Sequence, residues 1–173
     1  GEAYNRLIAG ILGNPELAKW KYLLTMEDDN LPPSDAHIRL LETIEWGKYD
    51  AVSGIYFTKG DLNMPMAYGS PEEHKRTGVL DFKPLDVRQA LSSGTVLEVT
   101  GIAMGCALWR MDLFREVQPP WFVTTSDIIE GKGTVCFTQD LAFCQKAKAA
   151  GKRFAVDLRV KVGHLDINTG VTF

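Results

Sequence analysis

The pattern of apolar and polar positions predicts alternating helices and strands in the first third of the chain. Apolar residues recur at helical spacing within Ala3–Leu12. The apolar run Tyr22–Met26 is typical of a buried strand. A second helix is expected to begin after the N-cap Ser34 and to end at Gly47. Asp50–Phe57 is another β-type run, and a strand, a helix and a strand at this spacing predict a βαβ unit.

The rest of the sequence combines two long aperiodic stretches with several short elements. Loops are expected at Thr58–Thr77 and Gln118–Val135. Short strands are expected at Val79–Phe82, Val96–Thr100, Phe154–Val156 and Val160–Val162. Helices are expected at Met111–Val117 and from the cap Thr138 to Gly151. This order predicts an α/β fold with a mostly parallel central sheet that is flanked by helices.

Length and composition fit one globular domain over residues 1–173. The chain is 45% hydrophobic and 24% charged, which argues against a disordered or coiled-coil protein. A net charge of −3 with scattered basic residues argues against nucleic acid as a partner. No stretch approaches the roughly 20 apolar residues that cross a bilayer, and no secretory signal is visible. The odd number of cysteines indicates free thiols in a reducing compartment, so we expect a cytoplasmic protein.

Three consecutive acidic residues are the strongest local signal for chemistry. Glu27, Asp28 and Asp29 follow the run Tyr22–Met26, and open α/β sheets bind ligands at such strand ends. If the extended backbone continues, Glu27 and Asp29 project to one side. Their carboxylate oxygens suit Mg²⁺ or Mn²⁺, which can bridge a diphosphate. A solvated turn explains the same residues, because Asp, Asn and Pro are turn formers.

Two polar residues at element ends are further candidates. Asp140 lies in the first turn of the last predicted helix, where the helix dipole alone explains a carboxylate. It is also a candidate general base for an attacking hydroxyl group. His164 follows an apolar strand and a glycine. It is either a hydrogen-bonded loop residue or an imidazole that completes a metal site.

Glycines and aromatic residues leave two alternatives each. The segment Gly101–Ala107 lacks the G-x-G-x-x-G and Walker patterns, so its glycines allow either close approach of a ligand or tight packing. Trp121 follows two prolines and is either an exposed platform for a sugar face or part of the core. No nucleophilic triad and no G-x-S-x-G motif is evident.

The order of these signals resembles that of the GT-A glycosyltransferases, particularly family 2-like and phage-type members. The residues that carry the likeness are Tyr22–Asn30, Thr100–Arg110 and Thr138–Cys144, extended by Val156-Asp157 and Val162–His164. The likeness covers nearly all of this chain but only the later part of the family domain. Family members open with a strand, a helix and a strand that bind the nucleotide, a unit of about 30 residues or more. The resemblance therefore implies an N-terminally truncated domain.

The resemblance also implies a nucleotide-sugar donor, a carbohydrate or other hydroxyl acceptor, and Mn²⁺ or Mg²⁺ as the cofactor. Glu27-Asp28-Asp29 matches the DXD motif of the family, with Asp29 and Glu27 toward the metal and Asp28 and Asp29 toward the donor. Asp140 matches the candidate base, and His164 matches a histidine of the metal shell. The residues that would border the acceptor and sugar pocket are Gly101, Met104, Gly105, Trp121 and Gln139. Two positions depart from the pattern: Glu27 replaces the first Asp, and Gln139 replaces an acidic residue before the base.

These features predict a metal-dependent glycosyltransferase that displaces the diphosphate directly, with inversion at the anomeric carbon. Retaining enzymes share the motifs, so retention stays open. A second hypothesis is a non-catalytic module that binds a sugar or a nucleotide, which the missing N-terminal unit favours. A third is a nucleotidyltransferase, which also uses acidic metal sites on α/β sheets.

Overall fold

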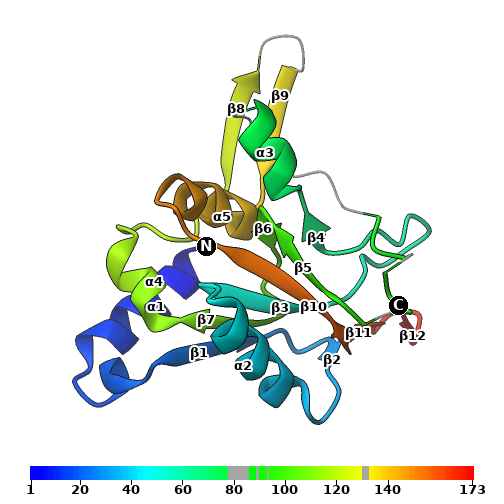
Figure 1. Cartoon of the computed structure of the whole chain (residues 1–173), viewed down its shortest axis with the longest axis horizontal. Coiled ribbons are helices and arrows are strands. Elements are labelled where there is room, and N and C mark those ends of the chain that lie inside the picture. Colours follow the sequence, from blue (N-terminus) through cyan, green and yellow to red (C-terminus); the bar gives the residue numbers. More distant parts are fainter. Residues whose placement is uncertain (78–85, 89, 93, 130–132) are drawn as a thin grey trace.

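A mixed sheet lies between helices in this computed structural model, which describes residues 1–77, 86–88, 90–92, 94–129 and 133–173 (Figure 1). The helices are α1 (Glu2–Gly13), the 3-10 helix η1 (Leu17–Lys19), α2 (Ala36–Gly47), α3 (Pro71–Thr77), α4 (Met111–Glu116) and α5 (Gln139–Ala149). The strands are β1 (Tyr22–Met26), β2 (Asn30–Leu31), β3 (Ala51–Ile55), β4 (Ala67–Tyr68), β5 (Val96–Val99), β6 (Gly101–Ile102), β7 (Cys106–Arg110), β8 (Thr125–Ile129), β9 (Gly133–Phe137), β10 (Phe154–Lys161), β11 (Gly163–Asp166) and β12 (Val171–Thr172).

The central sheet has the order β1-β7-β3-β10-β5 and is mixed rather than mostly parallel. Among the described strands of this sheet, only β3 and β10 pair in parallel, whereas β7 runs antiparallel to both β1 and β3. The predicted α/β class is confirmed, but the prediction of a mostly parallel sheet is wrong. The reason is that β7 inserts between the two strands of the expected βαβ unit. These two strands still run in the same direction, because both are antiparallel to β7.

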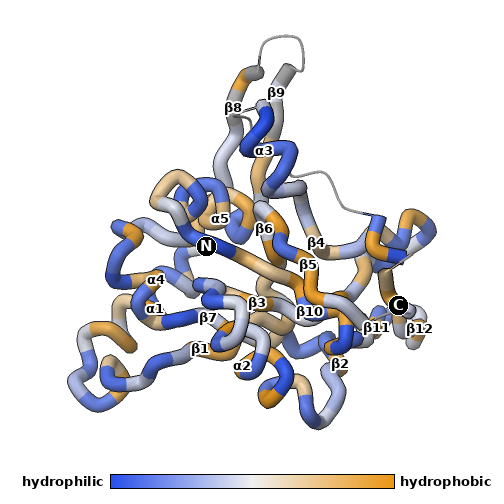
Figure 2. The backbone as a smooth tube through the Cα atoms, viewed as in Figure 1, coloured by the Kyte–Doolittle hydropathy of each residue, from blue (hydrophilic) through white to orange (hydrophobic). Residues whose placement is uncertain are grey.

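Alternate side chains of the central strands face two separate cores. Trp109 of β7 packs on the side of α1, α4 and α5, where Phe143 is also buried. Leu108, the preceding residue, faces Leu40 and Ile44 of α2. This alternation follows the pleat of the strands and gives helix, sheet and helix layers. In Figure 2, hydrophobic stretches lie along the central strands, whereas α3 is hydrophilic.

The long helices begin and end close to the predicted positions. α1 and α5 match the periodic segments, and Thr138 is the N-cap residue of α5. α2 begins one residue later than predicted, because Asp35 rather than Ser34 is its N-cap. After Gly47, Lys48 ends this helix in the left-handed conformation, with φ of 53°. No helix in the described parts of the chain is long and apolar enough to span a membrane.

Two predicted loops contain regular structure. The stretch Thr58–Thr77 includes β4 and α3, and Gln118–Val135 includes β8 and the first residues of β9. These two strands form a hairpin that projects from the body of the molecule (Figure 1). Phe154–Lys161 is one continuous strand instead of two. The predicted strand Val79–Phe82 lies outside the described residues.

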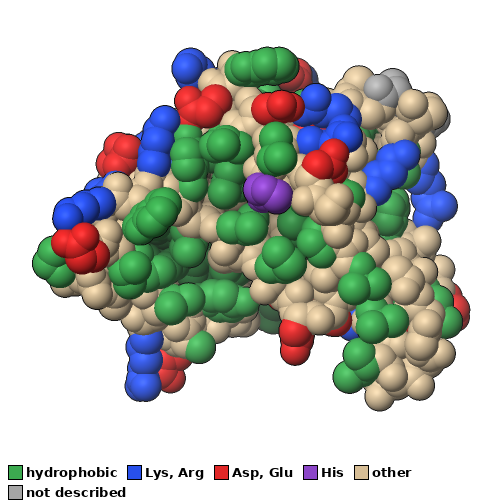
Figure 3. Space-filling model, turned by 90° about the horizontal axis from the view of Figure 1, so that it is seen from below, with side chains coloured by type: hydrophobic (Ala, Val, Ile, Leu, Met, Phe, Trp, Pro, Cys, Tyr) green, Lys and Arg blue, Asp and Glu red, His purple; other side chains and the backbone are tan. Residues whose placement is uncertain are grey.

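β1 is an edge strand of the central sheet, and none of its residues is fully buried, so the prediction of a buried strand is wrong. Leu24 and Met26 on β1, together with Ile38 and Leu41 on α2, are exposed. Figure 3 shows hydrophobic side chains gathered on the face seen from below, where β1 and α2 lie. Leu23 packs against one core and Tyr22 against the other, so each face of the strand is covered only in part.

Trp109 is the largest side chain buried at the centre of the molecule, and its removal should destabilise the fold. It is 0% exposed, and its indole Nε1–H donates a 2.9 Å hydrogen bond to Thr25 Oγ1. We expect Trp109→Ala to lower the free energy of unfolding by about 3–5 kcal/mol. Urea unfolding measures this loss. Trp46→Ala is the matched control, because Trp46 is 80% exposed and should change stability by no more than about 0.5 kcal/mol. Equal losses in the two variants would contradict this picture of the core.

Candidate functional site

The acidic triplet forms a tight turn directly after β1. The backbone N–H of Asn30 donates to the carbonyl of Glu27 at 3.2 Å, so the extended backbone does not continue past Met26. Glu27 and Asp29 nevertheless flank one amide group. Nδ2 of Asn30 lies 3.4 Å from Glu27 Oε2 and 3.2 Å from Asp29 Oδ1. Asp28 is exposed at the tip of the turn.

Gly105 fixes this turn against the sheet. Its carbonyl accepts a 2.9 Å hydrogen bond from the N–H of Glu27, and its own N–H donates to the hydroxyl of Tyr56 at 2.8 Å. A Cβ atom at position 105 would lie 2.5 Å from that hydroxyl oxygen and 2.8 Å from Asn30 Nδ2. The glycine therefore permits tight packing, which is one of the two alternatives that the sequence left open.

His164 reaches the triplet from β11, where it pairs with Asn30 of β2. Its Nδ1 lies 2.7 Å from the carbonyl oxygen of Phe57. Because a carbonyl oxygen can only accept, Nδ1 is the donor in this contact, and Nε2 faces Asp29. Nε2 is 3.5 Å from Asp29 Oδ2. The fold thus brings the predicted histidine and the predicted aspartate together.

Asp140 lies in the first turn of α5, as predicted. The Thr138 hydroxyl donates a hydrogen bond to Asp140 Oδ1, and the N–H of Leu141 lies 3.0 Å from the same oxygen. The charge of Asp140 contributes to the raised pKa values of Glu27 and of Tyr68, the latter about 12. The fold therefore brings Asp140 close enough to the triplet for their charges to interact, although more than 100 residues separate them in sequence.

The two carboxylates of the turn differ in their electrostatic environment. Burial raises the pKa of Glu27, and the negative charges of Asp29 and Asp140 raise it further. His164 and the Asn30 amide act on the pKa of Glu27 in the opposite direction. The hydrogen bond from Lys59 lowers the pKa of Asp29, and its Nζ lies 2.5 Å from Asp29 Oδ2. The negative charges of Glu27 and Asp29 thus lie close together, and the ammonium group of Lys59 offsets them in part.

Sequence reasoning missed several residues of this site. Lys59 lies in the aperiodic stretch after β3, where no motif marked it. Tyr56 and Tyr68 are phenols whose pKa values are raised mainly by burial and also by Asp140. Tyr4 of α1 has a pKa that burial, Glu27 and Asp140 raise. Asn30 alone carried a signal, because it follows the triplet directly.

Asp29 and His164 are the residues best placed to hold a divalent cation. Within the described parts of the chain, no group of three or more His, Cys, Asp or Glu side chains lies close enough to bind an ion by itself. Mg²⁺ is commonly bound through one or two carboxylates together with substrate phosphates. The carbonyl contact of His164 Nδ1 also orients the ring as for metal-binding histidines. The carboxylate of Asp29 and the imidazole of His164 could thus supply two ligands to such an ion.

The residues predicted to border a sugar pocket have mixed environments. Gly101 and Met104 are buried, and the Met104 carbonyl accepts a 2.9 Å hydrogen bond from the Thr25 hydroxyl. Gln139 is half-buried at the start of α5. Trp121 is only 6% exposed, and its indole N–H donates to the Val117 carbonyl at 2.7 Å. Trp121 therefore belongs to the core, and no exposed aromatic platform forms at this position.

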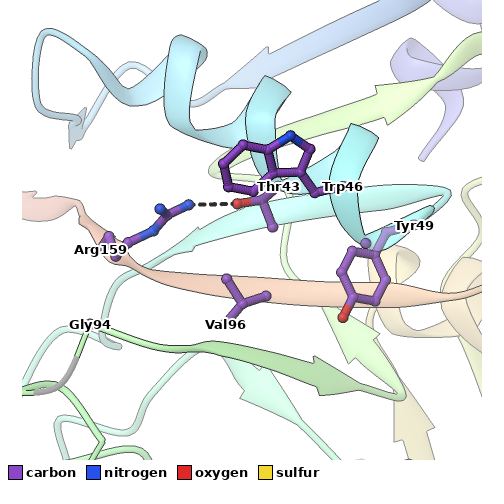
Figure 4. Close-up of a pocket in the computed structure, with 7 residues that line it drawn as sticks. Thr43, Trp46, Tyr49, Gly94, Val96 and Arg159 are labelled. Carbon is purple, nitrogen blue, oxygen red and sulfur yellow. Dashed lines mark hydrogen bonds between the residues drawn. The ribbon is translucent and has the colours of Figure 1, made fainter.

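A cavity of about 380 Å³ between α2 and β5 contains none of the predicted site residues. Thr43, Trp46 and Arg159 are among the residues that line it (Figure 4). The buried carboxylate of Asp157 accepts hydrogen bonds from Thr43 at 2.6 Å and from Arg159 Nη2 at 2.7 Å. Because these groups satisfy one another, we interpret the network as structural and assign the site to the carboxylates near Asp29 instead.

Comparison with known protein families gave no match, and comparison with curated proteins gave none either. Among solved structures, the chain is similar to A197 from STIV, with a TM-score of 0.62 and 17% sequence identity. The likeness covers 94% of this chain and 65% of A197, so the chain spans 65% of the length of that neighbour. At this identity the similarity shows a shared α/β fold and nothing about activity.

The raised pKa of Glu27 predicts how a neutral residue will behave at this position. In the unfolded chain Glu27 titrates near 4.5, and folding raises that pKa. The wild type therefore loses stability as the pH rises from 4.5 through the higher folded pKa, and Glu27→Gln does not. We expect Glu27→Gln to be at least as stable as the wild type at neutral pH, with the difference disappearing below pH 4.5.

Glu98→Gln is a control of opposite sign for this measurement. The hydrogen bond from Arg153, 2.6 Å from Nη2 to Oε2, lowers the pKa of Glu98. Stability from this group is present above its unfolded pKa and is lost as the pH falls through the folded pKa. Glu98→Gln should thus be less stable than the wild type at neutral pH. Thermal unfolding from pH 3.5 to 7.5 measures both variants, and equal signs would contradict the charge assignments.

Proposed function

We propose that this chain carries the catalytic half of a metal-dependent glycosyltransferase site, which moves a sugar from a nucleotide-diphosphate donor to an acceptor hydroxyl group. One observation supports this most strongly. Glu27 and Asp29 lie in one turn, whereas His164 comes from β11 and Asp140 from α5, yet the charges of the other three all act on the pKa of Glu27. Burial of mutually repelling carboxylates is typical of functional sites rather than of structural ones. The resemblance to GT-A enzymes names the same four residues.

Asp140 is suited to the role of general base. It lies at the N-terminus of α5, where the helix dipole stabilises its charged form. The Thr138 hydroxyl holds Oδ1, which restricts the carboxylate to one orientation. In this proposal Oδ2 of Asp140 accepts the proton of the acceptor hydroxyl group. At the same time the oxygen of that hydroxyl group attacks the anomeric carbon, and the bond from this carbon to the diphosphate breaks. Displacement with a single base predicts inversion at that carbon.

The turn after β1 is suited to the donor. A divalent cation bound by Asp29 and His164 would offset the negative charge that develops on the leaving diphosphate. Asn30 holds both Glu27 and Asp29 through its amide, so the two carboxylates keep a fixed separation. Tyr56, Tyr68 and Tyr4 keep the surroundings partly apolar, which strengthens charge interactions there.

Transfer should depend on the two aspartates in this site. We expect Asp140→Asn to lower the rate of transfer by about 10²–10⁴-fold, because an amide cannot accept the proton. Asp29→Asn should abolish the response to Mn²⁺. The assay is release of nucleoside diphosphate from a panel of nucleotide sugars with mixed acceptor glycans. Asp112→Asn is the matched control, since Asp112 is exposed on α4 and pairs with Arg115. Full activity of Asp140→Asn would remove the base from this mechanism.

The same assay separates the two other hypotheses. Binding of Mn²⁺ and a nucleotide without turnover would favour a non-catalytic module. Release of pyrophosphate instead of nucleoside diphosphate would favour a nucleotidyltransferase.

A further inference from the structure

We propose that Lys59 is an internal counter-ion of this site. In the proposal it occupies the position of the divalent cation on Asp29, and it moves to the phosphates of the donor when that cation binds. The inference rests on the proposed function, because it concerns the same carboxylates. It assigns a role to a residue that no motif marked.

Both oxygens of Asp29 are engaged in this structure. Oδ1 lies 3.2 Å from the Asn30 amide nitrogen, and Oδ2 lies 2.5 Å from Lys59 Nζ. Oδ2 is also the oxygen that faces Nε2 of His164, at 3.5 Å. A cation shared by Asp29 and His164 would need this same oxygen. Lys59 and the cation therefore compete for one position.

The surroundings of the ion pair make this competition significant. The side chains of Lys59 and Asp29 are both about two-thirds or more shielded from solvent, so water screens their charges incompletely. Asn30 is 5% exposed, and its Oδ1 has no hydrogen-bond partner among the residues that the structure describes. A buried amide oxygen without a partner beside two carboxylates is a place where a further donor or a cation is expected.

The segment that carries Lys59 also orients the histidine. The carbonyl of Phe57, two residues before Lys59, accepts the hydrogen bond from His164 Nδ1. The next residue, Thr58, donates its N–H to the Met64 carbonyl at 2.8 Å and closes the loop. One short segment thus contacts both residues that would hold the cation. Movement of Lys59 away from Asp29 would leave the Phe57 contact in place, because the two contacts are made by different residues.

The phosphates of the donor are a suitable new partner for the ammonium group of Lys59 once it leaves Asp29. A donor diphosphate that reaches the cation also comes within reach of Lys59, and lysine is a common ligand of phosphate oxygens. Exchange of the Asp29 carboxylate for a phosphate oxygen keeps the lysine charge paired throughout. The partner chemistry is therefore a diphosphate bound together with a divalent ion.

Mn²⁺ binding in the absence of any donor tests the competition directly. Electron paramagnetic resonance of free Mn²⁺ gives the affinity of the whole chain. We expect Lys59→Gln to bind Mn²⁺ about tenfold more tightly than the wild type, because a competing positive charge is removed. Lys59→Arg keeps the charge and should resemble the wild type. Lys161→Gln removes an exposed lysine and is the matched control.

Pyrophosphate tests the destination of the lysine. Titrated as its equimolar Mn²⁺ complex in calorimetry, it should bind Lys59→Gln about tenfold more weakly than the wild type, since a charge-assisted hydrogen bond is lost. A merely structural lysine would not tighten one ligand and weaken the other. Opposite changes for Mn²⁺ and its pyrophosphate complex are therefore the result expected.

The outcomes separate this inference from the proposed function. If the wild type binds Mn²⁺, Asp29→Asn loses it and Lys59→Gln is unchanged, the inference is overturned and the cation site stands. If no variant binds Mn²⁺, the cation site and the inference both fail. If the Lys59 variants behave as expected but no sugar is transferred, the exchange stands and the proposed transferase activity fails.

Discussion

The close approach of the turn after β1 to Gly105 is the constraint on which the candidate site depends. The Glu27 N–H bonds to the Gly105 carbonyl, and Tyr56 receives the Gly105 N–H from the opposite side. Both contacts require that position 105 has no Cβ, because one would collide with Tyr56 and Asn30. The pairing of β7 between β1 and β3 delivers Gly105 to this point. The order of the strands therefore determines where the carboxylates of the turn lie, because it places Gly105 beside them.

The arrangement of negative charges in the candidate site is unfavourable for the stability of the fold. A sequence selected only for stability would not bury Glu27 beside Asp29 and Asp140, since each of these charges raises the pKa of Glu27. The charge of Asp157, by contrast, is paired: this residue is fully buried, but Thr43 and Arg159 Nη2 donate to its Oδ2, and Arg159 Nε donates to its Oδ1. The Asp157 carboxylate is thus neutralised by its own partners, whereas Glu27 lies beside like charges, and this contrast is the reason for placing the proposed site at the turn after β1.

The sequence predicts element types better than it predicts their arrangement. Periodicity and capping located α1, α2 and α5, and the triplet, Asp140 and His164 lie near one another as expected for a single site. The order of the strands could not be predicted, because the apolar run of β7 has the same pattern whether its neighbours are parallel or antiparallel. The sequence predicts a loop where the hairpin β8–β9 lies, because the polar residues of these strands show no clear alternation. Lys59 could not be found because a loop lysine carries no pattern, and its partner is 30 positions away in sequence.

The location of the site follows from where chain segments end rather than from any one element. The triplet follows β1, Phe57 and Lys59 follow β3, His164 follows β10, and Asp140 begins α5. β1, β3 and β10 run in one direction, so their carboxyl ends meet on the same side of the sheet, even though β7 separates the first two. The proposed site therefore lies at the carboxyl ends of strands that run in one direction, which is where ligands bind in parallel sheets. The antiparallel β7 does not disturb it, because this strand contributes its amino end, and with it Gly105, to the same side.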